Sequence, residues 1–252
     1  DMIAYTRKAG IDIAMNTNGR LMTPAKNETL VKSLDWIRIS VNGGTSESYS
    51  KVHGTSEKDF EIVMSNIQDL VEKKKEFNSD IVIGVQCVLL EENHKDIAIM
   101  AKRLKEIGVD YYAVKPFLKH PGTKFNSELK NKKEVLTELE KLKSLNDDNF
   151  QFALRAGNFT PQSGERSYRN CLSGPFMIEV DAYGDVYSCG PHIGDKRHCY
   201  GNVIEQSFED MWNSERCKKV MKYVQETLDV SKCMPNCRPN SVNKFLWELN
   251  NP

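Results

Sequence analysis

Over the first 117 residues, apolar and polar positions alternate between two patterns, one typical of strands and the other typical of helices. Short apolar runs bounded by turn residues predict strands at 11–15, 36–42, 81–90 and 111–117. Apolar residues at helical spacing predict helices in the intervals, with Thr23 and Ser56 as N-caps. Because strands and helices alternate strictly, we expect an α/β fold with right-handed crossovers and a parallel sheet or barrel.

The first eight residues have the pattern of a helix rather than that of a strand. A parallel β/α domain is expected to open with a strand, so we expect an N-terminal part of this domain to precede the sequence given. The patterns divide the chain into three parts. These are an incomplete barrel at 1–118, a connector at 119–170 with a helix at 132–145 and a short strand at 150–154, and a small cysteine-bearing module at 171–252.

The composition of the chain bears on two questions: which classes of partner it binds, and whether its cysteines bind metal or form disulfides. The 35 Lys and Arg residues balance 35 Asp and Glu residues, so no net charge points to nucleic acid or to an anionic membrane. No apolar run approaches the length of a membrane span, and we expect a cytoplasmic location. The count of seven cysteines is odd, which favours metal ligation over a disulfide framework.

Four cysteines in the last third of the chain form two pairs. Cys171 and Cys189 bracket a predicted hairpin with Gly184 at its turn, and Cys233 and Cys237 stand with three residues between them. Thiolates brought together from separate segments suit an iron–sulfur cluster or a zinc ion, and the spacing alone leaves both open. Either metal predicts that this module needs it in order to fold.

Cys87, Cys217 and the histidines are not expected to bind a metal. Cys87 should face the opposite side of its strand from Gln86 and act as a small buried apolar residue. Cys217 lies among helix residues, which predicts a packed thiol. The five histidines show no metal-ligand spacing, so we expect His192 and His198 to be surface groups or to support the cysteine loop from outside the ligand set.

Polar residues stand where the predicted strands end. Ligand-binding groups of a β/α barrel belong at the carboxyl ends of its strands. This rule selects eight residues: Asn16, Thr17, Asn18, Ser40, Asn42, Gln86, Lys115 and Pro116. Asparagines beside Gly19 are also typical of an ordinary turn. Lys115 is unusual in an apolar strand and suits a substrate carboxylate or phosphate, and Arg155, Arg166 and Arg169 suit either an anionic substrate or a solvated surface.

The cysteine module resembles the C-terminal auxiliary-cluster domain, SPASM or twitch, of radical S-adenosylmethionine (SAM) enzymes. Cys171-x12-Gly184-x4-Cys189 is similar to the opening of the SPASM pattern, and Cys233-x3-Cys237 is similar to its closing pair. The intervening stretch, with Gly201-Asn-Val and a helix that contains Trp212, resembles the usual continuation.

The first part of the chain resembles the later strands of the radical SAM barrel, with Thr17-Asn18-Gly19 at the position of that family's TNG loop. The resemblance implies a partial (β/α) TIM-like barrel followed by a small α+β module with a β-hairpin. It implies that an auxiliary [4Fe–4S] cluster is held by Cys171, Cys189, Cys233 and Cys237. It also implies that Ser40, Asn42 and Gln86 reach the ribose and carboxylate of SAM, and that Lys115 and Pro116 back its adenine or methionyl end.

Two departures from the family pattern qualify the resemblance. The Cys-x3-Cys-x2-Cys motif for the SAM-cleaving cluster is absent from the 252 residues, as is the segment that meets the SAM amino group. We therefore expect a fragment, inactive alone, rather than a naturally degenerate protein. The module also lacks the cysteines of a second auxiliary cluster and in this respect resembles the shorter twitch form. Cys199 has no counterpart in the pattern and is an alternative ligand for the single cluster.

The function implied by the resemblance is that of a redox enzyme. A deoxyadenosyl radical would abstract hydrogen from the substrate, and the auxiliary cluster would accept or relay an electron. The full-length protein would bind SAM and a second [4Fe–4S] cluster, with an electron donor such as flavodoxin or ferredoxin. Its substrate would be a sugar, another small-molecule alcohol or a peptide. The alternative is a non-catalytic binding or scaffold protein, stabilised by iron–sulfur or zinc, with a degenerate core.

Overall fold

The computed structural model describes residues 2–117, 125–155, 166–234 and 237–251. Backbone contacts divide the chain into two compact units, residues 1–160 and residues 161–252. This division lies inside the predicted connector, so the boundaries proposed at 118 and 170 stay predictions.

The first unit contains a five-stranded parallel sheet in the simple order β1-β2-β3-β4-β5. Its strands are β1 (Ala14–Thr17), β2 (Trp36–Ser40), β3 (Val82–Leu89), β4 (Tyr111–Pro116) and β5 (Gln151–Leu154). The helices of this unit are α1 (Met2–Lys8), α2 (Pro24–Ser33), α3 (Ser46–His53), α4 (Glu57–Glu76), α5 (Ile97–Ile107) and α6 (Lys132–Glu140), with short 3₁₀ turns η1 (His94–Asp96) and η2 (Lys141–Leu145). Parallel strands in sequential order are the arrangement of a partial β/α barrel, so the predicted fold class is confirmed.

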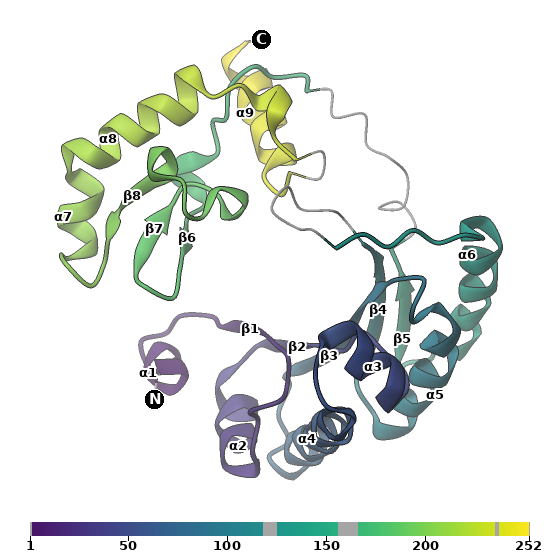
Figure 1. Ribbon diagram of the computed structural model, residues 1–252. Coiled ribbons are helices and arrows are strands. Elements are labelled where there is room, and N and C mark those ends of the chain that lie inside the picture. Colours follow the sequence, from purple (N-terminus) through teal and green to yellow (C-terminus); the bar gives the residue numbers. More distant parts are fainter. Residues whose placement is uncertain (1, 118–124, 156–165, 235–236, 252) are drawn as a thin grey trace. The chain divides into compact units, whose positions relative to one another are not determined.

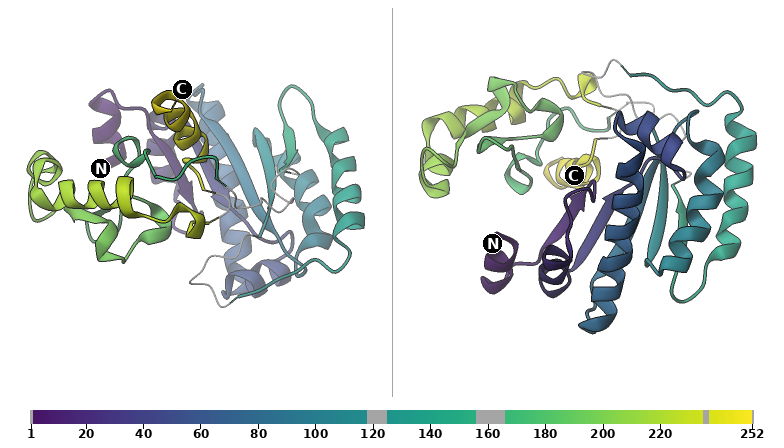
Figure 2. Two further views of the ribbon diagram at one scale, coloured as in Figure 1. Left: turned by 90° about the horizontal axis from the view of Figure 1, so that it is seen from above. Right: turned by 60° about the horizontal axis from the view of Figure 1, so that its bottom comes forward.

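The two faces of this sheet differ in their covering. Helices α2, α4, α5 and α6 lie along one face (Figures 1 and 2), where β-strand residues such as Ile37 and Val85 join Phe60 and Leu104 in one apolar core. Burial alternates along β2, whose second and fourth residues are buried and whose others are only half-buried. We call the less covered side, which carries the residues in register with Arg38, the open face.

Helix boundaries follow local chemistry. The Thr23 side chain accepts from the backbone N–H of Lys26 at 3.4 Å, and the Ser56 side chain accepts from that of Lys58 at 3.3 Å, which confirms both predicted caps. Gly108 ends α5 in the left-handed conformation at φ +94°. Sequence reasoning missed α3, whose capping box is formed by Thr45 with Ser48.

Two predicted boundaries require correction. The first strand runs over Ala14–Thr17 rather than 11–15, because it pairs with β2 only from Ala14, opposite Trp36. Asn16 and Thr17 therefore belong to the strand and not to the loop that follows. The predicted helix at 132–145 divides into α6 and the tighter turn η2 from Lys141 onward.

Gly84 allows the ring of Tyr111 to lie against strand β3 on the open face. A Cβ atom at position 84 would overlap the Tyr111 ring. We therefore expect Gly84→Ala to lower the free energy of unfolding by about 1–3 kcal/mol, the usual cost of overpacking. Urea unfolding measures the change. In a Tyr111→Ala background the same substitution should cost much less, and an equal cost in both backgrounds would show that the ring is not the obstacle.

The second unit holds a three-stranded antiparallel sheet in the order β6-β7-β8. Its strands are β6 (Glu179–Val180), β7 (Asp185–Tyr187) and β8 (Cys199–Asn202). Its helices are α7 (Phe208–Asn213), α8 (Glu215–Lys222) and α9 (Asn240–Asn250), with 3₁₀ turns η4 (Gly174–Phe176), η5 (Gly190–His192), η6 (Lys196–His198) and η8 (Val230–Lys232) and a π-turn η7 (Tyr223–Thr227). Gly184 turns the β6–β7 hairpin at φ +82°, which confirms the predicted hairpin. A separate apolar core includes Val186, Tyr200 and Met211.

Candidate functional site

The structure brings together the four cysteines that the sequence pairs. Cys189 lies just after β7, separated from it by Ser188, and Cys233 ends the turn η8. Cys171 and Cys237 lie shortly before η4 and α9. All four are half-buried free thiols. Cys171, Cys233 and Cys237 all lie close enough to Cys189 to act on its ionisation electrostatically. Thiols from three separate segments, the last of which carries both Cys233 and Cys237, thus converge in one unit.

Burial governs the protonation of these thiols. Burial raises the pKa of Cys189 to about 12, and the nearby Cys237, Cys171 and Cys233 add to the increase. Burial also raises the pKa of Cys233 and of Cys237. Thiols in this condition are protonated at neutral pH, so metal binding must displace their protons, as it does whenever cysteine becomes a thiolate ligand.

The donor set of four cysteine thiols suits both metal groups that the sequence left open, a zinc ion and a cubane iron–sulfur cluster.

Asn243 of α9 organises the segment that carries Cys171. Its Oδ1 accepts from the backbone N–H groups of Leu172 at 2.7 Å and Ser173 at 3.0 Å. Its Nδ2 donates to the Cys171 Sγ at 3.5 Å. The Asn243 side chain is 1% exposed, so these hydrogen bonds have no competition from water. Hydrogen bonds to ligand sulfur stabilise the reduced form of a cluster and tune its potential.

Arg166 performs a similar role beside the closing pair. Its Nη2 donates to the Met234 carbonyl at 2.6 Å and its Nη1 donates to the Asn240 Oδ1 at 2.9 Å. The Asn240 Oδ1 also accepts from the Tyr168 hydroxyl at 3.0 Å. The guanidinium charge partly offsets the burial that raises the pKa of Cys237, so it favours the thiolate that a cluster needs. Arg166, which the sequence offered as a substrate contact or surface group, lies at the metal centre instead.

The other cysteines occupy different surroundings. Cys217 is 1% exposed within the core of the second unit, which confirms a packed thiol. Cys87 is fully buried on the helix-covered face, opposite the face of Gln86, as the strand alternation predicts. Cys199 is buried in β8 with its Sγ 3.7 Å from the Gly201 carbonyl oxygen, where it remains only a proposed alternative ligand.

Four of the eight predicted strand-end residues share the open face. Strand register places Asn16 opposite Arg38, and Ser40 opposite Gln86. Lys115 lies two residues beyond Ala113, the partner of Gln86, and is on the same face. The Arg38 Nε donates to the Asn16 Oδ1 at 2.8 Å, so Asn16 is held by its neighbour. The structure thus gathers these residues on one side of the sheet.

The other four predicted residues have structural roles. Thr17 and Pro116 point to the opposite face, and the Thr17 hydroxyl accepts from the Gly19 N–H at 3.1 Å. The Asn18 Oδ1 accepts from the backbone N–H of Arg20 at 3.1 Å, as in an ordinary turn. The Asn42 Oδ1 accepts from the Val88 N–H at 2.8 Å and prolongs the β2–β3 pairing.

Sequence reasoning missed three groups near these residues. Arg38 and Tyr111 are on the open face; burial raises the pKa of Tyr111, and the charges of Arg38 and Arg155 oppose that rise. Asn93 is fully buried and its Nδ2 donates to the carbonyl oxygens of Asn42 and Val88 at 3.1 Å and 2.9 Å. The sequence did contain a signal for Arg38, because it alternates with apolar residues in its strand and should therefore lie on the opposite face of the sheet from them.

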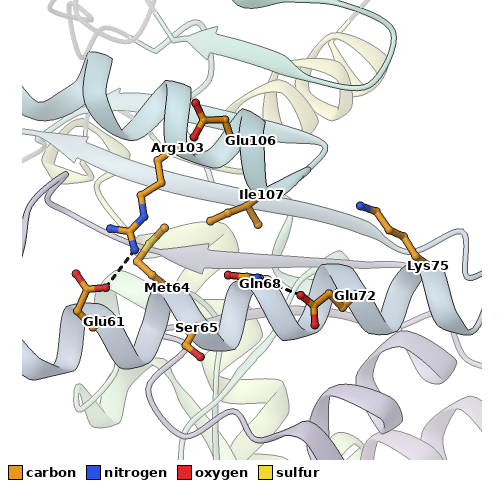
Figure 3. A pocket seen from close by; sticks show the side chains of 9 residues that line it. All are labelled: Glu61, Met64, Ser65, Gln68, Glu72, Lys75, Arg103, Glu106 and Ile107. Atoms are coloured by element: carbon orange, nitrogen blue, oxygen red, sulfur yellow. Dashed lines mark hydrogen bonds and ion pairs between the residues drawn. The ribbon is translucent and has the colours of Figure 1, made fainter.

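A surface groove lies on the outer layer of helices, between α4 and α5 (Figure 3). Glu61 of α4 accepts from the Arg103 guanidinium of α5 at 3.1 Å across it. Its other lining residues are Met64, Ser65, Gln68, Glu72, Lys75, Glu106 and Ile107. None of the predicted strand-end residues lines this groove, because they belong to the strands beneath or to the other face of the sheet.

The four-thiol centre and the open parallel sheet are the arrangement expected of an iron–sulfur protein built on part of a β/α barrel. Residues 171–239 match the family model of the SPASM domain, which is described as an iron–sulfur cluster-binding domain. The chain therefore contains a SPASM domain, and the match begins at the first predicted ligand, Cys171, and includes the last, Cys237.

Solved structures of proteins with bound S-adenosylmethionine share the fold of the chain. Streptococcus suis SuiB bound to S-adenosylmethionine matches with a TM-score of 0.63 at 15% identity, over 89% of this chain and 52% of that one. SuiB bound to the precursor peptide SuiA gives 0.61 at 16% identity, over 85% and 50%. Native anSMEcpe with bound AdoMet and the Kp18Cys peptide gives 0.50 at 17% identity, over 93% and 65%. The predicted fold class is confirmed.

The chain spans about half the length of SuiB and less than two thirds of anSMEcpe. A search of curated proteins found no match to the sequence. Among the described residues, no helix has both the length and the apolar character to cross a membrane.

Proposed function

We propose that this chain is the SAM-facing and auxiliary-cluster portion of a redox-type radical SAM enzyme that modifies a peptide. The observation that carries the proposal is the convergence of Cys171, Cys189, Cys233 and Cys237 within a SPASM domain. The parallel half-barrel that precedes this domain supports the proposal, because its fold is that of enzymes solved with bound SAM.

The open face of the sheet supplies the groups that SAM would need. Ser40 and Gln86 lie opposite one another near the carboxyl ends of β2 and β3, where they can bond the ribose and the carboxylate. Lys115 adds a positive charge near the same end of β4. SAM and a second [4Fe–4S] cluster, for which these 252 residues hold no Cys-x3-Cys-x2-Cys motif, would supply the radical chemistry, and the residues of the open face would bind and orient SAM.

We infer an electron-transfer role for the auxiliary centre from its four cysteines. With one thiolate for each of its four irons, a bound [4Fe–4S] cluster would have no iron open to a substrate, and it would transfer electrons rather than bind the substrate. Asn243 and Arg166 hold the ligand loops and place a hydrogen bond and a positive charge beside them. A peptide is the proposed substrate because SuiB and anSMEcpe were solved with peptides. A flavodoxin or ferredoxin donor and a cytoplasmic location complete the proposal.

Reductive SAM cleavage tests this proposal in the protein that contains the chain. We expect 5′-deoxyadenosine to form when dithionite and a peptide substrate are supplied. Gln86→Ala should raise the KM for SAM about tenfold, because a hydrogen bond to a charged group contributes about 1.5 kcal/mol or more. Gln151→Ala is the matched control. Gln151 is exposed on the same face of the sheet but at the amino end of its strand.

Two outcomes would contradict the proposal. The absence of 5′-deoxyadenosine from an iron-loaded preparation would favour the non-catalytic, cluster-stabilised alternative. Equal KM values for the two glutamine variants would remove Gln86 from the SAM contacts while leaving the enzyme class standing.

A further inference from the structure

A second group of metal-ligand side chains lies between β7 and β8, apart from the four cysteines. His192, Asp195 and His198 follow one another at intervals of three residues. The Asp195 N–H donates to the His192 carbonyl at 3.0 Å, and the His198 N–H donates to the Asp195 carbonyl at 2.9 Å. Hydrogen bonds of this i to i+3 type bring every third side chain to the same edge of the backbone.

The three side chains present their ligand atoms to one point. One ligand atom from each residue lies within 4.8 Å of those of the other two. The imidazole rings of His192 and His198 are stacked with centroids 3.8 Å apart and planes inclined by 3°. No other set of three such side chains in the described part of the chain meets this spacing.

His198 has an unused nitrogen that is suited to a metal. The residue is 1% exposed, and its Nε2 is buried without a hydrogen-bond partner among the described residues. Its Nδ1 lies 2.8 Å from the Ser188 Oγ. In the tautomer that carries its proton on Nδ1, this proton is donated to the hydroxyl and the Nε2 lone pair is free, as is usual for histidine ligands.

The protonation of the two histidines suits ligation. Burial lowers the pKa of His198 to about 4, and the neighbouring His192 adds to the decrease. Burial also lowers the pKa of His192. Neutral imidazoles offer a lone pair to a metal at neutral pH without first losing a proton.

We propose that His192, Asp195 and His198 bind one zinc-class divalent ion, with water as a further ligand, at a site distinct from the four-cysteine centre. Two imidazole nitrogens and one carboxylate oxygen are a donor set that zinc accepts readily. The ion would tie together the loop that begins at the cluster ligand Cys189. This site does not depend on SAM chemistry.

Binding requires two local adjustments. Stacked rings direct their lone pairs along parallel planes, so the partly exposed His192 must tilt while the buried His198 stays in place. Asp195 must also share its carboxylate, which now accepts from the Arg197 Nη2 at 2.6 Å. The Arg197 side chain is 68% exposed and is free to swing into solvent. Arg197 therefore competes with the ion, and its removal should tighten binding.

Zinc binding to the cluster-loaded chain tests the site. With iron and sulfide occupying the cysteines, equilibrium dialysis against zinc chloride should show one additional equivalent. Zinc-edge X-ray absorption should show only nitrogen and oxygen neighbours at about 2.0 Å, with no sulfur at about 2.3 Å. His192→Ala and Asp195→Asn should each weaken binding at least tenfold, and Arg197→Ala should strengthen it severalfold.

His94→Gln, which removes a half-buried histidine from the first unit, is the matched control and should leave zinc binding unchanged. Iron and sulfide content, compared for all variants, shows whether each one keeps its folded module. Sulfur neighbours around zinc, no retained zinc, or equal binding by His192→Ala in an iron-loaded module would each overturn the proposal.

Discussion

Cys189→Ala is expected to abolish cluster binding and to unfold the second unit. The thiol lies close enough to Cys171, Cys233 and Cys237 to interact with them electrostatically, and it follows the short strand β7 with one residue between. A cubane cluster with one ligand missing loses its closed coordination. Because binding of a structural metal centre contributes on the order of 10 kcal/mol to folding, its loss exceeds the stability of a small module. Iron and sulfide should fall from about four of each per chain to almost none.

Cys217→Ala is the matched control for this experiment. Cys217 is a buried thiol of the same unit, within its apolar core. We expect this variant to keep its iron, its sulfide and its visible absorption. Iron and sulfide retained in Cys189→Ala would remove Cys189 from the ligand set. One zinc per chain without sulfide, in the unaltered protein, would replace the iron–sulfur assignment with the zinc one.

Asn243→Leu is expected to have the second largest effect. Leucine is similar in size, but it leaves the half-buried N–H group of Leu172 and the buried N–H group of Ser173 without an acceptor. Each such loss costs about 1–3 kcal/mol, so we expect the free energy of unfolding to fall by about 2–5 kcal/mol. Guanidinium unfolding of the cluster-loaded chain, followed by circular dichroism, measures this change.

A second variant separates the stability role of Asn243 from its effect on the cluster. Asn243→Asp keeps an oxygen acceptor for the two N–H groups but replaces the Nδ2 donor to the Cys171 Sγ with negative charge. The cluster potential should therefore become more negative in a redox titration followed by electron paramagnetic resonance. Asn250→Ala, at the exposed end of the same helix, should change neither quantity. An unaltered potential in Asn243→Asp would show that this hydrogen bond does not reach the cluster.

The sequence predicted most of the first unit because its signals are local. The apolar run of β3, the caps at Thr23 and Ser56 and the left-handed Gly108 each act within a few residues. The start of β1 was wrong because an edge strand extends only as far as its single partner allows. The sequence analysis also did not predict the face of the sheet to which each strand-end side chain points. Thr17 and Pro116 stand at strand ends, but alternation turns them to the helix-covered face.

The sequence pairs the four cysteines that the structure brings together, but it gives no sign of the residues that surround them. Cysteine spacing pointed to Cys171 and Cys237, whereas Asn243 is about seventy residues from the thiol that it contacts and carries no motif. His192 and His198 were missed for another reason. Sequence reading expects histidine ligands on α-helical or strand spacing, whereas this loop uses 3₁₀-type turns, in which intervals of three place side chains together. The absence of ligand spacing inferred from the sequence is corrected here, since these two residues and Asp195 do converge.

The positions of the four cysteines have a consequence for biosynthesis. Cys171 opens the SPASM module and Cys237 lies near its end, so a ribosome must complete α7 and α8 before the last proposed ligand emerges. During that interval the first thiols have no cluster to protect them from oxidation. Iron–sulfur delivery must therefore keep pace with translation. In cells that synthesise the chain faster than they assemble clusters, we expect the half-barrel, which has an apolar core of its own, to accumulate with an unfolded C-terminal module.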